Sequence, residues 1–100
     1  MATTSLPLND AKRLIETILA QGTVVFTWHC RHESMPRRGV TDQEVRLVLE
    51  TGQIVRAPEW DAQFQNWKYR VEGVDTDGDD LTVVTVIIES AFTLRILTVF

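Results

Sequence analysis

Residues 66–100 decide the fold, and their three informative stretches are Asn66-Trp-Lys-Tyr-Arg-Val-Glu-Gly73, Leu81-Thr-Val-Val-Thr-Val-Ile-Ile-Glu89 and Thr93-Leu-Arg-Ile-Leu-Thr-Val-Phe100. The first stretch alternates apolar and polar residues, as a half-exposed strand does. The second is mostly β-branched, which is typical of a central strand covered on both faces. The connections between the stretches are short enough for hairpins. The pattern therefore predicts a three-stranded antiparallel meander that reaches the last residue.

The first quarter of the sequence predicts a helix from about Asn9 to Ala20, followed by a strand. Asn9 suits an N-cap position, and Gly22 is placed for a left-handed C-terminal cap. Apolar residues recur at helical spacing and form one stripe: Ala11, Leu14, Ile15, Ile18 and Leu19. Thr23-Val-Val-Phe-Thr-Trp28 then has the β-branched and aromatic composition of a strand.

A second helix has the clearest local signal, and it begins after Thr41. Thr41 and Glu44 have the spacing of a capping box, and Gly52 follows the last apolar position of the helix. Ile54-Val55 is a candidate for a short additional strand. The sequence thus predicts an α+β fold, with two helices in the N-terminal half packed on a three- to four-stranded antiparallel sheet.

The composition predicts one soluble globular domain over residues 1–100, with 44% hydrophobic and 24% charged residues. One cysteine excludes an intrachain disulfide. The first residues lack the features of a secretory signal, and no apolar run is long enough to span a bilayer. We therefore expect a cytoplasmic location and no membrane association. The net charge of −4 argues against broad nonspecific nucleic-acid binding, although residues 1–40 alone carry five basic and three acidic groups.

The segment Trp28-His-Cys-Arg-His-Glu-Ser-Met-Pro-Arg-Arg-Gly-Val-Thr41 concentrates the polar chemistry of the chain. It contains both histidines, which can transfer protons near neutral pH. Metal-independent RNA cleavage needs such a group for the 2′-hydroxyl and cations for the phosphate. His29 and His32 are the candidate catalytic residues. The candidate phosphate- or partner-binding residues are Arg31, Arg37, Arg38, Tyr69 and Arg70, with Lys68 beside them. The alternative is a polar loop whose arginines bond nearby carboxylates.

Two further clusters of polar residues resemble metal sites, but we expect neither to bind a metal ion, and we expect no cofactor. His29, Cys30, His32 and Glu33 offer zinc-compatible donors, but such close neighbours cannot all face one ion. The acidic run Asp75-Thr-Asp-Gly-Asp-Asp80 lacks the glycine and glutamate positions of an EF-hand, so it predicts a solvated hairpin turn. Cys30 is expected to be a free, partly buried thiol.

Trp60 and Phe64 lie four residues apart in a segment that we expect to be an irregular loop over residues 58–65. Together they predict a small apolar patch suited to a protein partner or a homodimer contact.

Met35-Pro-Arg-Arg-Gly-Val-Thr41, Gly52-Gln-Ile-Val55 and the hairpin that begins at Tyr69 resemble the signature of a family of small bacterial domains of unknown function. The resemblance covers residues 26–100. It implies a family-like core over residues 23–100 and an extra helix over residues 1–22.

That family is similar to the RelE/BrnT-like toxins, which are small α+β proteins that cleave RNA and are held inactive by an antitoxin. This second resemblance implies a metal-independent endoribonuclease or an RNA or phosphate binder, with RNA or an antitoxin-like protein as the partner. When the signature is aligned on Met35, however, its histidine falls on Cys30. The alternative is a protein-interaction module without catalysis.

Overall fold

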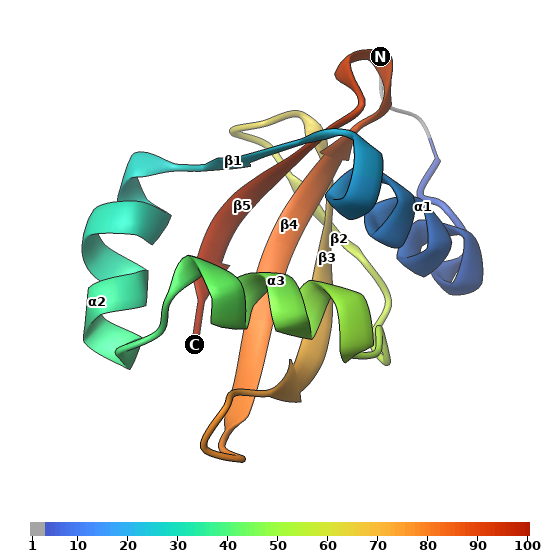
Figure 1. The fold of residues 1–100 in the computed structure, drawn as a ribbon. Helices are drawn as coiled ribbons and strands as arrows, with labels where there is room; N and C mark the ends of the chain where they lie inside the picture. Colours follow the sequence, from blue (N-terminus) through green and yellow to red (C-terminus); the bar gives the residue numbers. More distant parts are fainter. Residues whose placement is uncertain (1–3) are drawn as a thin grey trace.

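The computed structural model describes residues 4–100 and has an α+β architecture, as predicted (Figure 1). Its helical elements are α1 (Leu8–Gln21), the π-helical segment η1 (Cys30–Ser34), α2 (Met35–Arg38), α3 (Asp42–Thr51) and the 3-10 turn η2 (Glu89–Ala91). Its strands are β1 (Thr23–Phe26), β2 (Glu59–Asp61), β3 (Asn66–Val74), β4 (Asp80–Ile88) and β5 (Thr93–Val99).

The predicted meander of β3, β4 and β5 is confirmed, but the whole sheet is larger than predicted. It has five strands in the order β1-β5-β4-β3-β2. β1 pairs with β5 in parallel, so the prediction of a purely antiparallel sheet of three or four strands was wrong. The four residues of β1 show strand composition but carry no signal for their partner. The chain between β1 and β5 holds α2, α3 and the strands β2, β3 and β4, and such a long connection allows a parallel pair.

α1 and α3 cover one face of the sheet and form the main core with it (Figure 1). The fully buried residues of the two helices are Ala11, Ile15, Ile18, Val45, Val48 and Leu49. They pack in one cluster with Val71, Leu81, Val83, Leu94 and Ile96 of the strands. This is the stripe-on-sheet arrangement that the two periodicities predict.

The helix ends confirm one prediction and correct two. The Thr41–Glu44 capping box is present. Pro7, not Asn9, occupies the N-cap position of α1, and it makes no side-chain capping hydrogen bond. Gly22 has φ of −109°, so it is not a left-handed cap. A side chain there would have no space, because an added Cβ would lie 2.4 Å from the Phe92 carbonyl oxygen.

The face of the sheet opposite α1 and α3 carries a smaller cluster of Val84, Val86 and Leu97. A β-bulge in β5 shapes this face. Val84 pairs with Thr98 and Thr85 pairs with Ile96, which leaves Leu97 as the extra residue. The bulge therefore turns Leu97 and Thr98 to the same side of the sheet. No helix within residues 4–100 is long and apolar enough to cross a membrane.

Candidate functional site

The segment that follows β1 is helical from Trp28 to Arg38, which corrects the predicted strand end at Trp28 and the loop of the alternative interpretation. That alternative also expected Arg37 and Arg38 to bond nearby carboxylates, and Arg38 does so. Thr27 starts this helix. Its hydroxyl accepts a hydrogen bond from the Cys30 amide (3.1 Å) and donates one to the Leu97 carbonyl (3.1 Å). One threonine thus caps the helix and satisfies the carbonyl of the β5 bulge.

A π-helical turn in the middle of this helix fixes the positions of its side chains. The Met35 amide bonds back to the Cys30 carbonyl, which widens the helix over Cys30–Ser34. Ser34 is buried, and its hydroxyl accepts a hydrogen bond from the Val99 amide (3.2 Å). The helix is therefore anchored to β5 by Ser34, and the same helix carries the exposed side chains of His29 and Glu33.

His29 forms the centre of the candidate site. Its Nδ1 lies 2.8 Å from a Glu33 carboxylate oxygen, and its Nε2 lies 3.5 Å from the Thr98 hydroxyl. A carboxylate can only accept, so Nδ1 carries the donated proton, and Nε2 is the nitrogen that is free to accept a proton whenever the ring is neutral. The contact with Thr98 is at the outer limit of a hydrogen bond, so Nε2 is only loosely held.

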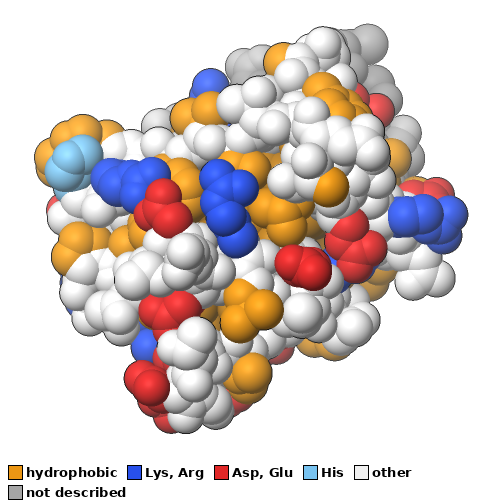
Figure 2. All heavy atoms as spheres, viewed as in Figure 1, with side chains coloured by type: hydrophobic (Ala, Val, Ile, Leu, Met, Phe, Trp, Pro, Cys, Tyr) orange, Lys and Arg blue, Asp and Glu red, His pale blue; other side chains and the backbone are white. Residues whose placement is uncertain are grey.

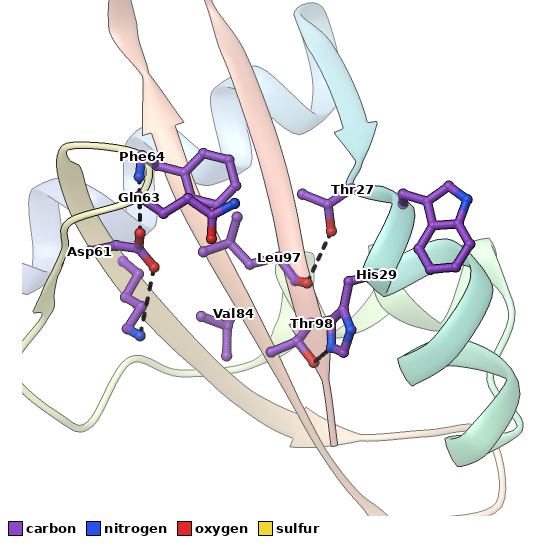
Figure 3. Close-up of a pocket in the computed structure, with 10 residues that line it drawn as sticks. Thr27, His29, Asp61, Gln63, Phe64, Val84, Leu97 and Thr98 are labelled. Atoms are coloured by element: carbon purple, nitrogen blue, oxygen red, sulfur yellow. Dashed lines mark hydrogen bonds and ion pairs between the residues drawn. The ribbon is translucent and has the colours of Figure 1, made fainter.

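Two adjoining cavities meet at His29 and Thr98. The larger has a volume of about 420 Å³ and extends to Asp61, Gln63 and Phe64 of the β2–β3 hairpin. Figure 3 shows His29 and Thr98 on one side of this cavity, the hairpin residues on the other, and Val84 and Leu97 between them. The smaller cavity, about 270 Å³, is lined by His29, Thr98, Arg37, Arg38 and Phe100. We call the two together the histidine groove.

The histidine groove has a cation at each end. Lys68 lines the larger cavity, and its Nζ lies 3.8 Å from an Asp61 carboxylate oxygen. Arg37 lines the smaller cavity, is exposed, and forms no ion pair with any residue of the described part of the chain. Arg38 is committed to structure instead, because its guanidinium binds the Asp75 carboxylate at 3.2 Å and the Asp80 carbonyl.

Arg70 lies beside the groove but is partly engaged elsewhere. Its guanidinium contacts Glu59 at 3.3 Å and lies 5.6 Å from the centre of the Phe100 ring. Phe100 in turn lines the smaller cavity. Arg70 therefore borders the Arg37 end of the groove through Phe100.

Three of the predicted site residues lie away from the groove. Arg31 pairs with Asp42 and covers the Phe26 ring at 4.2 Å. His32 stacks on Trp28, with 4.9 Å between ring centres.

Tyr69 is the third of these residues, and it is buried on the helix-covered face. Its hydroxyl accepts a hydrogen bond from the Leu6 amide at 2.8 Å, and burial raises the pKa of the phenol. The predicted cluster is thus divided: His29, Arg37 and Arg38 share the groove, whereas Arg31, His32 and Tyr69 do not.

The predicted Trp60/Phe64 patch is also divided. Trp60 lies edge-on to Trp67 across the β2–β3 pair, with ring centres 5.5 Å apart, and Trp67 packs on the main core. Phe64 packs on the opposite cluster of Val84 and Leu97. The two aromatic rings therefore belong to opposite faces of the sheet. The reason is that residues 59–61 form a strand, where we expected an irregular loop.

The acidic hairpin is a closed turn. Asp75 accepts hydrogen bonds from the Asp77 and Asp79 amides, both at 2.9 Å. The Asp79 and Asp77 amide bonds, with a contribution from Arg38, hold the pKa of Asp75 below its usual range. Asp75, Asp77 and Asp79 are the one group of metal-compatible side chains close together within residues 4–100, but Asp75 is already bonded within the protein. The turn predicted from the sequence is confirmed, although Asp75 itself is buried rather than solvated.

Cys30 is a free thiol, buried in the π-helical segment, and burial raises its pKa. A thiol held neutral in this way is a poor nucleophile. The zinc-compatible donors around it do not gather into a metal-sized cluster anywhere in the described chain.

Sequence reasoning missed Thr27, Asp61, Gln63 and Thr98. The i, i+4 spacing of His29 and Glu33 is the one signal that was available, because these residues meet on a helix.

The helix-covered face of the sheet is a poorer candidate for a binding site than the histidine groove. Figure 2 shows that basic and acidic side chains are interspersed there, without one large basic patch.

The fold and the groove define a small α+β domain with a helix-borne histidine beside a bulged sheet strand. The chain belongs to the family described as a domain of unknown function (DUF4258), which it matches over residues 26–100. α1 lies outside that match. No curated protein and no solved structure shows a significant match to the chain.

Proposed function

We propose that this chain binds RNA in the histidine groove and cleaves it without a metal ion. One observation carries the proposal: His29 has Nδ1 bonded to Glu33 and Nε2 open at the junction of two cavities. Lys68 and Arg37 provide a positive charge on each side of that nitrogen. Such an arrangement suits the cleavage of a phosphodiester. The group carries one negative charge in the ground state and two in the transition state, so cations stabilise the transition state and a base accepts the proton of the attacking hydroxyl.

The reaction that fits these groups is transfer within the RNA strand. Nε2 of His29 accepts the proton of a 2′-hydroxyl, and the 2′-oxygen forms a bond to the adjacent phosphorus. The bond from phosphorus to the 5′-oxygen breaks, and a water molecule protonates the leaving oxygen while it takes the proton back from Nε2 of the His29 imidazolium. The products are a 2′,3′-cyclic phosphate and a free 5′-hydroxyl. Glu33 holds the imidazole in the required tautomer and stabilises the imidazolium that forms.

The test is the cleavage of a 5′-labelled single-stranded RNA by the wild-type protein and two histidine variants. We expect His29→Gln to reduce the cleavage rate at least 100-fold, since an acid–base group typically contributes about 10²–10⁴-fold. His32→Gln is the matched control and should leave the rate unchanged, because His32 lies outside the groove. Equal activity of His29→Gln, or cleavage of DNA at the same rate, would contradict the proposal.

The second candidate is a protein-interaction module without catalysis, and the net charge of −4 favours it. An antitoxin-like protein is the partner implied by the toxin resemblance. Trp60, which is 44% exposed, is the contact that such a partner or a second copy of the chain would use. Expression of the intact chain in bacteria separates the two candidates. Growth arrest that His29→Gln abolishes supports the nuclease in the cytoplasm, whereas normal growth supports the interaction module.

We further propose that residues 1–100 form one domain, in which α1 is an addition to the family core. Ala11, Ile15 and Ile18 of α1 are fully buried in the same cluster as the strands of the matched region, which supports a single domain. The family match begins at residue 26, after α1, which supports the view of α1 as an addition.

A further inference from the structure

We infer that the larger cavity of the histidine groove is a binding pocket for one unpaired nucleobase, so that the RNA recognised by this chain is single-stranded. The inference rests on the proposed function, because it places in this cavity the base of the nucleotide next to the phosphate at His29. It adds what the phosphate site alone does not provide, which is a requirement for a base.

The floor and one wall of this cavity are apolar. Val84 and Leu97 form the floor, with exposed fractions of 4% and 9%. Phe64 stands at the hairpin side, and the Arg95 guanidinium lies 5.5 Å from the centre of its ring. A volume of about 420 Å³ falls within the range of pockets for small organic ligands. An aromatic wall over an aliphatic floor suits a flat, apolar-faced group such as a base.

The rim of the cavity offers hydrogen bonds to the edge of a base. Asp61 supplies acceptors, Gln63 supplies an amide with both donors and an acceptor, and Lys68 supplies a donor. The Asp61 Oδ1 atom accepts the Phe64 amide at 3.0 Å, which holds this carboxylate in place. Its Oδ2 atom lies 3.8 Å from the Lys68 Nζ, beyond hydrogen-bond distance. No described residue donates a hydrogen bond to Oδ2, so this atom remains an acceptor for the N–H donors of a base edge.

The pocket lies directly beside His29, which is one of the residues that line it. His29 and Thr98 form the wall opposite Phe64 and Gln63 (Figure 3). A base seated on Val84 and Leu97 would place its own backbone toward that wall, where Nε2 of His29 is open. A base in a duplex has its edge occupied by its partner and its faces by neighbouring bases, so a paired base could not enter.

The test uses 2′-O-methyl hexanucleotides, which have no free 2′-hydroxyl and cannot be cleaved. We would measure binding by fluorescence anisotropy for a single-stranded hexamer, for an abasic backbone of the same length, and for the hexamer in a duplex. We expect the single strand to bind about tenfold more tightly than the abasic backbone or the duplex, which corresponds to stacking of about one base. Phe64→Ala should remove this difference. Trp60→Ala is the matched control, because Trp60 lies in the same hairpin on the opposite face.

A second variant keeps the test meaningful if Phe64→Ala unfolds. Asp61→Asn retains the oxygen that accepts the Phe64 amide but replaces the other acceptor by a donor. We expect Asp61→Asn to change the order of affinities among the four homohexamers, while the affinity for the abasic backbone stays the same. If the abasic backbone binds as tightly as the base-bearing strand, the phosphate site stands and the pocket assignment is wrong. If neither oligonucleotide binds, both the pocket and the proposed function fail.

Discussion

The polar residues of the segment from Trp28 to Thr41 fall into two groups: some face the histidine groove, and others are held in contacts within the protein. His29 faces the groove with an open nitrogen, whereas His32 is held by Trp28, whose ring it stacks on and whose carbonyl it contacts at 3.2 Å. The same division separates the two adjacent arginines: Arg37 is exposed, and Arg38 is bonded to Asp75. The sequence could predict that these residue types gather in one segment. It could not predict which of them face the groove, because that depends on a π-helical turn without a known local signal.

The lowered pKa of Asp75 predicts how the free energy of unfolding depends on pH in the acid range. Its pKa is lowered in the folded protein, so it stabilises the fold above the ordinary carboxyl pKa and loses this effect as the pH falls through its lower folded value. We expect the stability difference between the wild type and Asp75→Asn to be constant near neutral pH and to shrink below about pH 4. Urea unfolding at a series of pH values measures it. A difference that grows with acidification would contradict the assignment.

At the level of elements, the structure shows which signals were local and which were not. The capping box of α3 and the alternation of β3 lie within their own segments, and both elements formed as predicted. The parallel pairing of β1 with β5 depends on residues about 70 positions apart, between which periodicity carries no information. The bulge at Leu97 is a shift in the register of β4 with β5, which the pattern of neither strand alone predicts. The groove lies at the junction of these non-local features, so most of its residues were missed.

The anchor between the π-helical segment and β5 is expected to hold the groove in shape. Ser34→Ala leaves the buried Val99 amide without its acceptor, which typically costs about 1–3 kcal/mol of unfolding free energy. The variant should also weaken RNA binding, since His29 sits on the same helix. Urea denaturation and anisotropy measure the two effects. Ser90→Ala, an exposed position, is the control and should change neither; equal behaviour of both variants would refute the role of Ser34.

For the whole molecule, the question is whether α1 belongs to the same cooperative unit as the family core. Ile15 is fully buried among residues of the matched region. We expect Ile15→Ala to lower the free energy of unfolding by about 2–5 kcal/mol and to keep a single transition. Tryptophan fluorescence and far-ultraviolet circular dichroism, followed in the same urea series, report the core and the helices. Two separate transitions would mean that α1 is an independent appendage.

The measurement that tests the central claim most directly is an NMR titration with an uncleavable single-stranded 2′-O-methyl hexamer. It follows the backbone amides and both imidazole rings. We predict that the shifts concentrate on the groove, at His29, Lys68 and Thr98, and that the His32 ring and Tyr69 remain unchanged. The Arg37→Ala variant should reduce these shifts at equal RNA concentration. Shifts centred on His32 and Arg31, or no shifts at millimolar RNA, would contradict the assignment of the histidine groove as an RNA site.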